Sequence, residues 1–207
     1  MKKIIHVILL GSFCLLESCS SIIYSLAGMR NPEMMDSKAI QKYAGKFDLP
    51  ENHSYYLDTT YIGFLKNSDS TRGSMKDHYQ PTQALYFQDE KPYPEAWFIN
   101  CRAYPKSFGV DWNRNGEFEK FLPAGNQKPD SLVTFDDIRQ LLKPVHNNAA
   151  PVSNTDNTVL VFYCKMFHRT SRDLISEVKR NAKLSQSPVT IFYVNVDNYI
   201  VPLLPKE

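Results

Sequence analysis

The middle of the chain carries the apolar and polar pattern of an antiparallel β-meander. Residues 84–87 and 96–101 are strand-like runs joined by a turn rich in proline and acidic residues. Residues 108–112 and 117–121 flank Asn-Arg-Asn-Gly (113–116), and an Asn-Gly step between such runs is typical of a hairpin. The predicted hairpin turns through a left-handed Gly116 and brings Trp112 near Phe118.

The C-terminal part predicts a parallel strand–helix–strand unit. Residues 159–164 form a continuous apolar run, as in a strand covered on both faces. Thr170, with Asp173 three residues later, can begin a helix, and its buried stripe contains Leu174, Ile175, Val178 and Ala182. A second strand over 189–196 completes the unit, and this spacing favours a parallel pair with a right-handed crossover.

Shorter elements surround these two regions. The sequence predicts a helix from Asp36 or Ser37 to Tyr43 ending at Gly45, and a short strand over 55–57. A second helix begins at Asp58 or Thr59, ends near Lys66, and leaves a long polar loop over 67–81. Thr134 and Asp137 form a capping box for a third helix that Pro144 stops. We therefore expect an α/β fold with α+β character, in a single globular domain over 36–207.

The N-terminus has the pattern of an export signal. Lys2 and Lys3 precede a mostly apolar run from Ile4 to Leu16, which is too short to span a bilayer. The string Leu-Glu-Ser-Cys-Ser-Ser (16–21) follows. It resembles a bacterial lipoprotein signal, in which the cysteine is acylated and becomes the first residue. The alternative is a plain secretory signal with an incidental cysteine.

The resemblance implies a signal peptide over 1–18, acylation with palmitate-type chains at Cys19, and a tether over 19–35. Several acyl chains give durable attachment, whereas one binds only marginally. Ser20 stands where an aspartate retains many lipoproteins at an inner membrane. We therefore expect a bacterial cell-envelope protein at the outer membrane, facing the periplasm, with the cell surface as the alternative.

The charge balance narrows the range of partners. The formal net charge is +2, and loss of Lys2, Lys3 and Glu17 with the signal lowers it to +1. A near-neutral chain has no electrostatic footprint for nucleic acid. The expected partners are the membrane, through the lipid anchor, and a protein or small ligand. No motif indicates a cofactor.

Two cysteines remain after Cys19. Cys164 precedes His168 by four residues at a strand-to-helix turn, where the helix start and the imidazole can favour a thiolate. The competing interpretation is a buried core thiol, which is the more common fate of such a cysteine. Cys101 and Cys164 can also pair as a disulfide, or remain two separate thiols.

A calcium loop is the other chemical candidate. Asp111, Asn113, Asn115 and Gly116 match the start of such a loop. The closing carboxylate falls at Leu122, so Glu117 or Glu119 would have to replace it. The Asn-Gly hairpin turn explains the same residues without a metal.

Residues 158–197 resemble the first half of a thioredoxin-like fold. The supporting strings are Val-Leu-Val-Phe-Tyr (159–163), the helix after it, and Val-Asn-Val-Asp (194–197). The resemblance places Phe167 and Thr170 at the family's two redox cysteine positions, so it implies the shape without the dithiol chemistry. The antiparallel middle region can complete the sheet in place of the family's closing hairpin.

The whole chain also resembles small lipoproteins of Bacteroidetes-type bacteria. Besides the signal, the similarity rests on Tyr-Tyr-Leu-Asp-Thr-Thr-Tyr (55–61) and Asp-Trp-Asn-Arg-Asn-Gly (111–116). It implies no activity. The sequence thus favours a lipid-anchored, non-catalytic binding or structural module. The alternatives are a thiol-dependent redox protein or sensor using Cys164, and a calcium-stabilised module built on residues 111–119.

Overall fold

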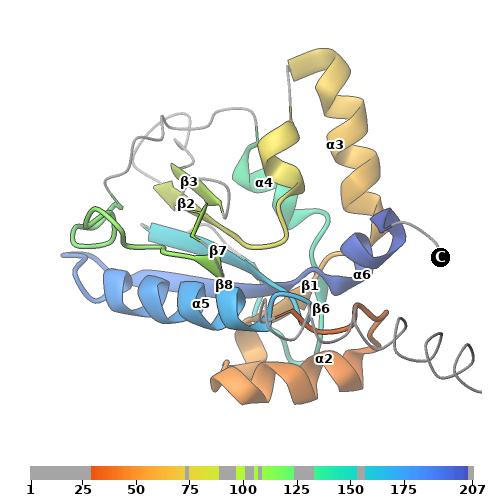
Figure 1. Ribbon diagram of the computed structural model, residues 1–207, viewed down its shortest axis with the longest axis horizontal. Coiled ribbons are helices and arrows are strands. Elements are labelled where there is room, and N and C mark those ends of the chain that lie inside the picture. Colours follow the sequence, from red (N-terminus) through yellow and green to blue (C-terminus); the bar gives the residue numbers. More distant parts are fainter. Residues whose placement is uncertain are drawn as a thin grey trace, which may run out of the picture.

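A mixed β-sheet lies at the centre of the fold (Figure 1). The structure is a computed structural model that describes residues 29–72, 75–88, 97–100, 105–106, 109–123, 133–152 and 157–204. The sheet has six strands in the order β3-β2-β7-β8-β1-β6. Their bounds are Trp97–Asn100, Gln83–Gln88, Asn157–Tyr163, Val189–Asn195, Ser54–Tyr56 and Lys143–Pro144.

The sheet is parallel on one side and antiparallel on the other. β7, β8 and β1 run parallel, while β2 and β3 extend the sheet antiparallel from β7. The short β6 closes the far edge antiparallel to β1. This mixed sheet confirms the predicted α/β class. The hairpin of β2 and β3 completes the sheet beside the C-terminal strand–helix–strand unit.

Helices cover both faces of the sheet. In Figure 1, α3 (Thr59–Arg72) and α4 (Phe135–Arg139) lie above the sheet, and α2 (Ser37–Ala44) and α5 (His168–Ala182) lie below it. The short α6 (Asp197–Ile200) follows β8. The 3₁₀ helices are η1 (Gly45–Phe47), η2 (Glu51–His53), η3 (Lys76–Tyr79) and η4 (Val201–Leu203).

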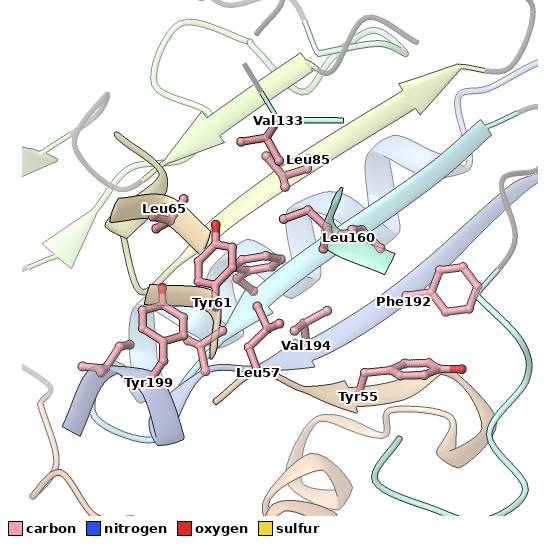
Figure 2. Packing of buried hydrophobic residues seen from close by; sticks show 14 of the residues in the cluster. Tyr55, Leu57, Tyr61, Leu65, Leu85, Val133, Leu160, Phe192, Val194 and Tyr199 are labelled. Carbon is pink, nitrogen blue, oxygen red and sulfur yellow. The ribbon is translucent and has the colours of Figure 1, made fainter. Parts of the chain in front are cut away.

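The alternation along the central strand explains this layering. Every residue of β7 is buried. Leu160 and Phe162 belong to the core between the sheet and helices α3 and α4 (Figure 2), whereas Val159, Val161 and Tyr163 belong to the core between the sheet and helices α2 and α5. Successive side chains of a strand point to opposite faces, and both faces of β7 are covered, which explains the continuous apolar run from Val159 to Tyr163.

The structure confirms several local predictions. α2 begins after Asp36, whose side chain accepts the Ala39 N–H, and Gly45 is its C-cap residue. Thr134 and Asp137 form the complete capping box of α4. α5 joins β7 to the parallel β8, as expected from the spacing of the C-terminal unit.

The second predicted hairpin is wrong. Val110, in β5 (Gly109–Val110), pairs with Pro105 of β4 (Pro105–Lys106) in a separate two-stranded sheet, and residues 111–122 form turns and bends. Gly116 does adopt the left-handed φ of 78°. The backbone here bonds to side chains instead of a ladder, because Asn113 Oδ1 accepts the Phe118 N–H.

Trp112 and Phe118 are both buried, in the core cluster that α5 covers. The indole N–H of Trp112 donates to the Thr170 carbonyl at 3.1 Å. The Asn181 amide donates to the carbonyls of Phe118 and Lys120 at 2.9 and 2.8 Å. Residues 112–120 are therefore held by α5 and not by strand pairing.

Three helix boundaries also differ from the predictions. α4 ends at Arg139, and Pro144 pairs with Tyr55 in β6 and does not stop the helix. α3 continues beyond Lys66 to Arg72, because the polar residues after Lys66 include neither proline nor glycine to end it. α3 therefore occupies residues 67–72 of the loop predicted over 67–81, and η3 lies in the remainder. α5 begins at His168, so Thr170 lies inside its first turn and is not the N-cap.

Candidate functional site

The carboxyl ends of the parallel strands form the edge where ligands bind in many α/β proteins. β7 ends at Tyr163 and β8 at Asn195, and the turn from β7 into α5 lies directly beyond them. Cys164, His168 and Asp197 all lie at this edge. A thiol, an imidazole and a carboxylate together suggest a nucleophile, a base and a group that orients the base. Their hydrogen bonds decide whether that arrangement exists.

Cys164 is buried at the beginning of this turn, with no exposed surface. The Ser171 hydroxyl accepts the Cys164 N–H at 3.0 Å and donates to the Cys164 carbonyl at 3.1 Å. The Cys164 sulfur accepts the N–H of Phe167 at 3.4 Å. The residue therefore fastens the turn to the first turns of α5.

Tyr43 of α2 closes over the turn from the other side. Its hydroxyl donates to the Cys164 carbonyl and lies 3.0 Å from both that oxygen and His168 Nδ1. Since the phenol has one hydrogen, the contact with His168 places a proton on Nδ1. Burial, followed by the nearby Cys164 and Asp197, raises the pKa of Tyr43, so it remains a neutral donor at physiological pH.

His168 packs among aromatic rings. Its ring stacks on Phe47 with centroids 5.2 Å apart and lies 5.8 Å from the Tyr43 ring. Burial, together with the charges of Arg30, Arg172 and Lys46, lowers its pKa below 6.5. His168 is therefore a neutral imidazole at neutral pH.

Asp197 binds the main chain and does not orient the imidazole. Both of its carboxylate oxygens accept the Lys165 N–H, at 3.0 and 2.9 Å, and the Asn195 side-chain amide donates at 2.8 Å. The carboxylate is only 1% exposed, and burial raises its pKa above 3.8 although these donors oppose the rise. The three groups thus do not form the relay of a nucleophilic enzyme, because Asp197 holds a backbone turn.

The sequence predicted Cys164 and His168 but missed Tyr43, Ser171 and Asp197. Asp197 directly follows a parallel strand, which is a usable signal for this edge. Tyr43 lies on the apolar side of α2 with Ile40 and Ala44, and this pattern predicts only burial. Its contact with Cys164 joins residues 121 positions apart, which no local pattern can show.

The predicted calcium loop bonds to itself. Asn113 donates its side-chain amide to Glu119, and Asn115 donates its backbone and side-chain N–H groups to Glu117. Asp111 is half-buried at the start of the loop. Within the described ranges, no three histidine, cysteine or acidic residues lie together in a way that could hold a metal. Calcium binding stays a prediction.

The predicted disulfide and the lipid anchor involve residues outside the described ranges. Cys101 and Cys19 both lie there, so the Cys101–Cys164 pairing and the acylation of Cys19 stay predictions. None of the described helices has the length and apolarity needed to cross a bilayer.

A shallow cavity of about 250 Å³ lies at the opposite edge of the sheet. It is lined by Gln88, Phe121, Asn157, Leu184, Ser185, Gln186 and Ser187. None of these side chains carries a charge, and Asn157 donates its amide to the Pro188 carbonyl at 3.4 Å. Amides and hydroxyls beside one aromatic ring suit a neutral, hydrogen-bonding ligand.

Comparisons with known proteins add nothing to this assignment. No protein-family model, curated protein or solved structure matches the chain. The described residues form an α/β fold in which the cluster of Cys164, His168 and Asp197 holds a turn.

Proposed function

We propose that this chain is a lipid-anchored protein of the bacterial cell envelope whose α/β domain is a non-catalytic binding or structural module. The complete burial of Cys164 is the main support for the second part. An activated cysteine needs a partly exposed thiolate that a substrate can reach, whereas a buried thiol is inert. The first part rests on the signal-like sequence that ends at Cys19.

The charge and the cavity support a binding module rather than an enzyme. The cavity beside Asn157 offers amides and hydroxyls, and its lining residues include no titratable group that could activate a serine hydroxyl as a nucleophile. A small neutral ligand with several hydroxyl groups fits that lining best. Ser20, after the acylated position, favours the outer membrane with the domain facing the periplasm, and the cell surface is the alternative location.

A thiol-dependent redox protein or sensor remains the second candidate. One contact favours it, because the Phe167 N–H at the start of a 15-residue helix donates to the Cys164 sulfur. A helix N-terminus stabilises a thiolate. The proposed thioredoxin-like shape, with β2 and β3 beside β7 in place of the family's own hairpin, is consistent with such an ancestry but leaves Phe167 and Thr170 at the redox positions.

Replacing Cys19 tests the anchor. The wild-type chain should float with membranes and carry the added mass of its acyl chains, whereas Cys19→Ala should appear in the soluble fraction, because the proposed acyl chains supply the durable attachment. Cys14→Ala is the matched control, since that cysteine lies inside the signal, and it should leave flotation unchanged. A Cys19→Ala protein that still floats contradicts the proposal.

Alkylation of Cys164 separates the two functions. In a Cys101→Ser background, the folded protein should react with iodoacetamide far more slowly than the same protein in urea, because Cys164 is fully buried. The rate should follow the opening of the fold and rise together with urea-induced unfolding. Rapid reaction of the folded protein at neutral pH would instead support the redox candidate.

A further inference from the structure

The chain enters the fold at the same edge that holds Cys164. The Arg30 N–H donates to the Met166 carbonyl at 2.8 Å, in the turn between β7 and α5. Met35 N–H donates to Asn198 Oδ1, and Asn198 Nδ2 donates back to the Met35 carbonyl, both at 2.8 Å. Residues 30–35 are therefore fastened between the turn before α5 and α6, at the right of Figure 1.

This entry point limits how far the domain can be from the bilayer. Arg30 follows the proposed acylation site, Cys19, by 11 positions. Even a fully extended chain of that length spans less than about 40 Å, and a flexible one averages roughly 20 Å. A domain of this size is itself roughly 40 Å across. The edge that receives the tether is therefore the part of the domain held nearest to the membrane.

Positive charge gathers around this entry. Arg30, Lys46 and Arg172 all act on His168, whose pKa they lower, and Arg169 is exposed in the first turn of α5. Nearby acids offset part of this charge, because Arg172 pairs with Asp173 and Lys165 pairs with Glu33. Asp36 caps α2 through the Ala39 N–H. No described carboxylate lies within ion-pair distance of Arg30, Lys46 or Arg169. The start of α5 adds the positive end of a helix dipole.

Exposed apolar side chains also mark this edge. Three large hydrophobic residues of the described chain are strongly exposed, namely Met34 at 58%, Leu184 at 48% and Leu203 at 46%. Met34 precedes Met35, which binds Asn198, and Leu203 follows Asn198 in η4. Two of the three thus flank the entry point, whereas Leu184 lies beyond the far end of α5. Apolar groups beside cations are typical of surfaces that rest in a lipid interface.

We infer that the surface around Arg30, Met34, Lys46 and Arg169, here called the entry surface, rests on an anionic bilayer. The cations contact lipid phosphates and Met34 enters the interfacial layer. This inference rests on the proposed lipid anchor and specifies how the anchored domain is oriented. The uncharged cavity beside Asn157, at the opposite edge of the sheet, then faces away from the membrane.

The test compares how close two labelled positions lie to the membrane surface. The full-length acylated protein, in a Cys101→Ser background, is labelled with a fluorophore at Met34→Cys or at Leu184→Cys and reconstituted in vesicles. The vesicles contain equal parts of phosphatidylcholine and phosphatidylglycerol, with a nitroxide-headgroup lipid as quencher. The label at position 34 should be quenched strongly and the label at 184 weakly, although both side chains are similarly exposed in the structure.

Charge variants test the role of the cations. Arg30→Gln combined with Arg169→Gln should reduce the equilibrium constant for contact with the membrane surface by roughly fivefold for each cation removed. This factor corresponds to the binding free energy of about 1 kcal/mol that each cation contributes near an anionic membrane. Lys120→Gln combined with Lys183→Gln removes the same charge at the far end of α5 and should change nothing. Added salt should weaken contact in the same way.

The outcomes separate this inference from the anchor. The inference is overturned if the labels at 34 and 184 are quenched equally, or if quenching at 34 is unchanged by Arg30→Gln and Arg169→Gln. In either case, protein that is acylated and floats with the vesicles still supports the lipid anchor. Protein that lacks acyl chains by mass and does not float overturns the proposed function itself.

Discussion

Leu160→Ala should lower the free energy of unfolding by about 2–5 kcal/mol. The variant loses the free energy of burying the removed methyl groups, and it leaves a cavity in the core. Leu160 is fully buried in β7, the most deeply enclosed strand, and lies opposite Leu85 of β2 in the pairing register (Figure 2). Urea denaturation followed by circular dichroism measures the loss. For a domain of ordinary stability, it is a large fraction of the total.

Leu184→Ala is the control for this change. It removes the same atoms from a side chain that is 48% exposed, so the expected effect is within about 0.5 kcal/mol. Equal losses for the two variants would contradict the placement of β7 at the centre of the sheet. The slope of free energy against urea should be the same in both proteins, since neither change alters the surface exposed on unfolding.

Asp197→Ala should be the other strongly destabilising change, at about 3 kcal/mol, because it leaves buried donors without an acceptor. The donors are the Lys165 N–H and the Asn195 amide. Asp173→Ala is the matched control, since Asp173 pairs with the exposed Arg172 side chain on the surface of α5 and accepts no buried donor among the described residues. Thermal and urea unfolding of the two variants should differ clearly, and equal stability would contradict the role of Asp197 in holding the turn.

Asp197 also predicts a pH dependence with a definite sign. Burial raises its pKa in the folded protein above the ordinary 3.8, so the folded state binds more protons than the unfolded state between these two values. The contribution of this group to stability is therefore greatest below pH 3.8 and falls as pH rises through the folded pKa. Relative to Asp197→Asn, which does not titrate, the original protein should lose stability over that window. A relative gain with rising pH would contradict burial as the dominant cause.

The sequence predicted the parts of the fold that local patterns control. The strand–helix–strand unit followed from an apolar run and the stripe of α5, and the capping box at Thr134 followed from residue spacing. The hairpin predicted at residues 113–116 does not form, because Trp112 and Phe118 pack against α5, a helix that begins some 50 residues later. Tertiary packing overrides a local turn signal when the aromatic residues beside the turn bury more apolar surface against another element than they would across a hairpin.

The candidate site was predictable only in part. Cys164 and His168 follow from their position after a buried strand, but their partners come from distant elements. Tyr43 reaches them from α2 and Asp197 from the end of β8. The sequence thus identifies which residues lie at the edge, whereas only the fold shows that their hydrogen bonds hold a turn.

The paired hydrogen bonds between Met35 and Asn198 affect the length of the free tether as well as the stability of the fold. While they and the Arg30–Met166 bond hold, the segment that connects lipid to domain ends at Arg30. If they release, the stretch from Arg30 to Met35 joins it and extends its maximum reach by about 20 Å. Asn198→Ala removes the Met35 bonds and leaves the Arg30–Met166 bond to keep residues 30–35 out of the tether. The domain should therefore reach farther from the membrane whenever that remaining bond opens, with no change in the cavity at the other end of the molecule.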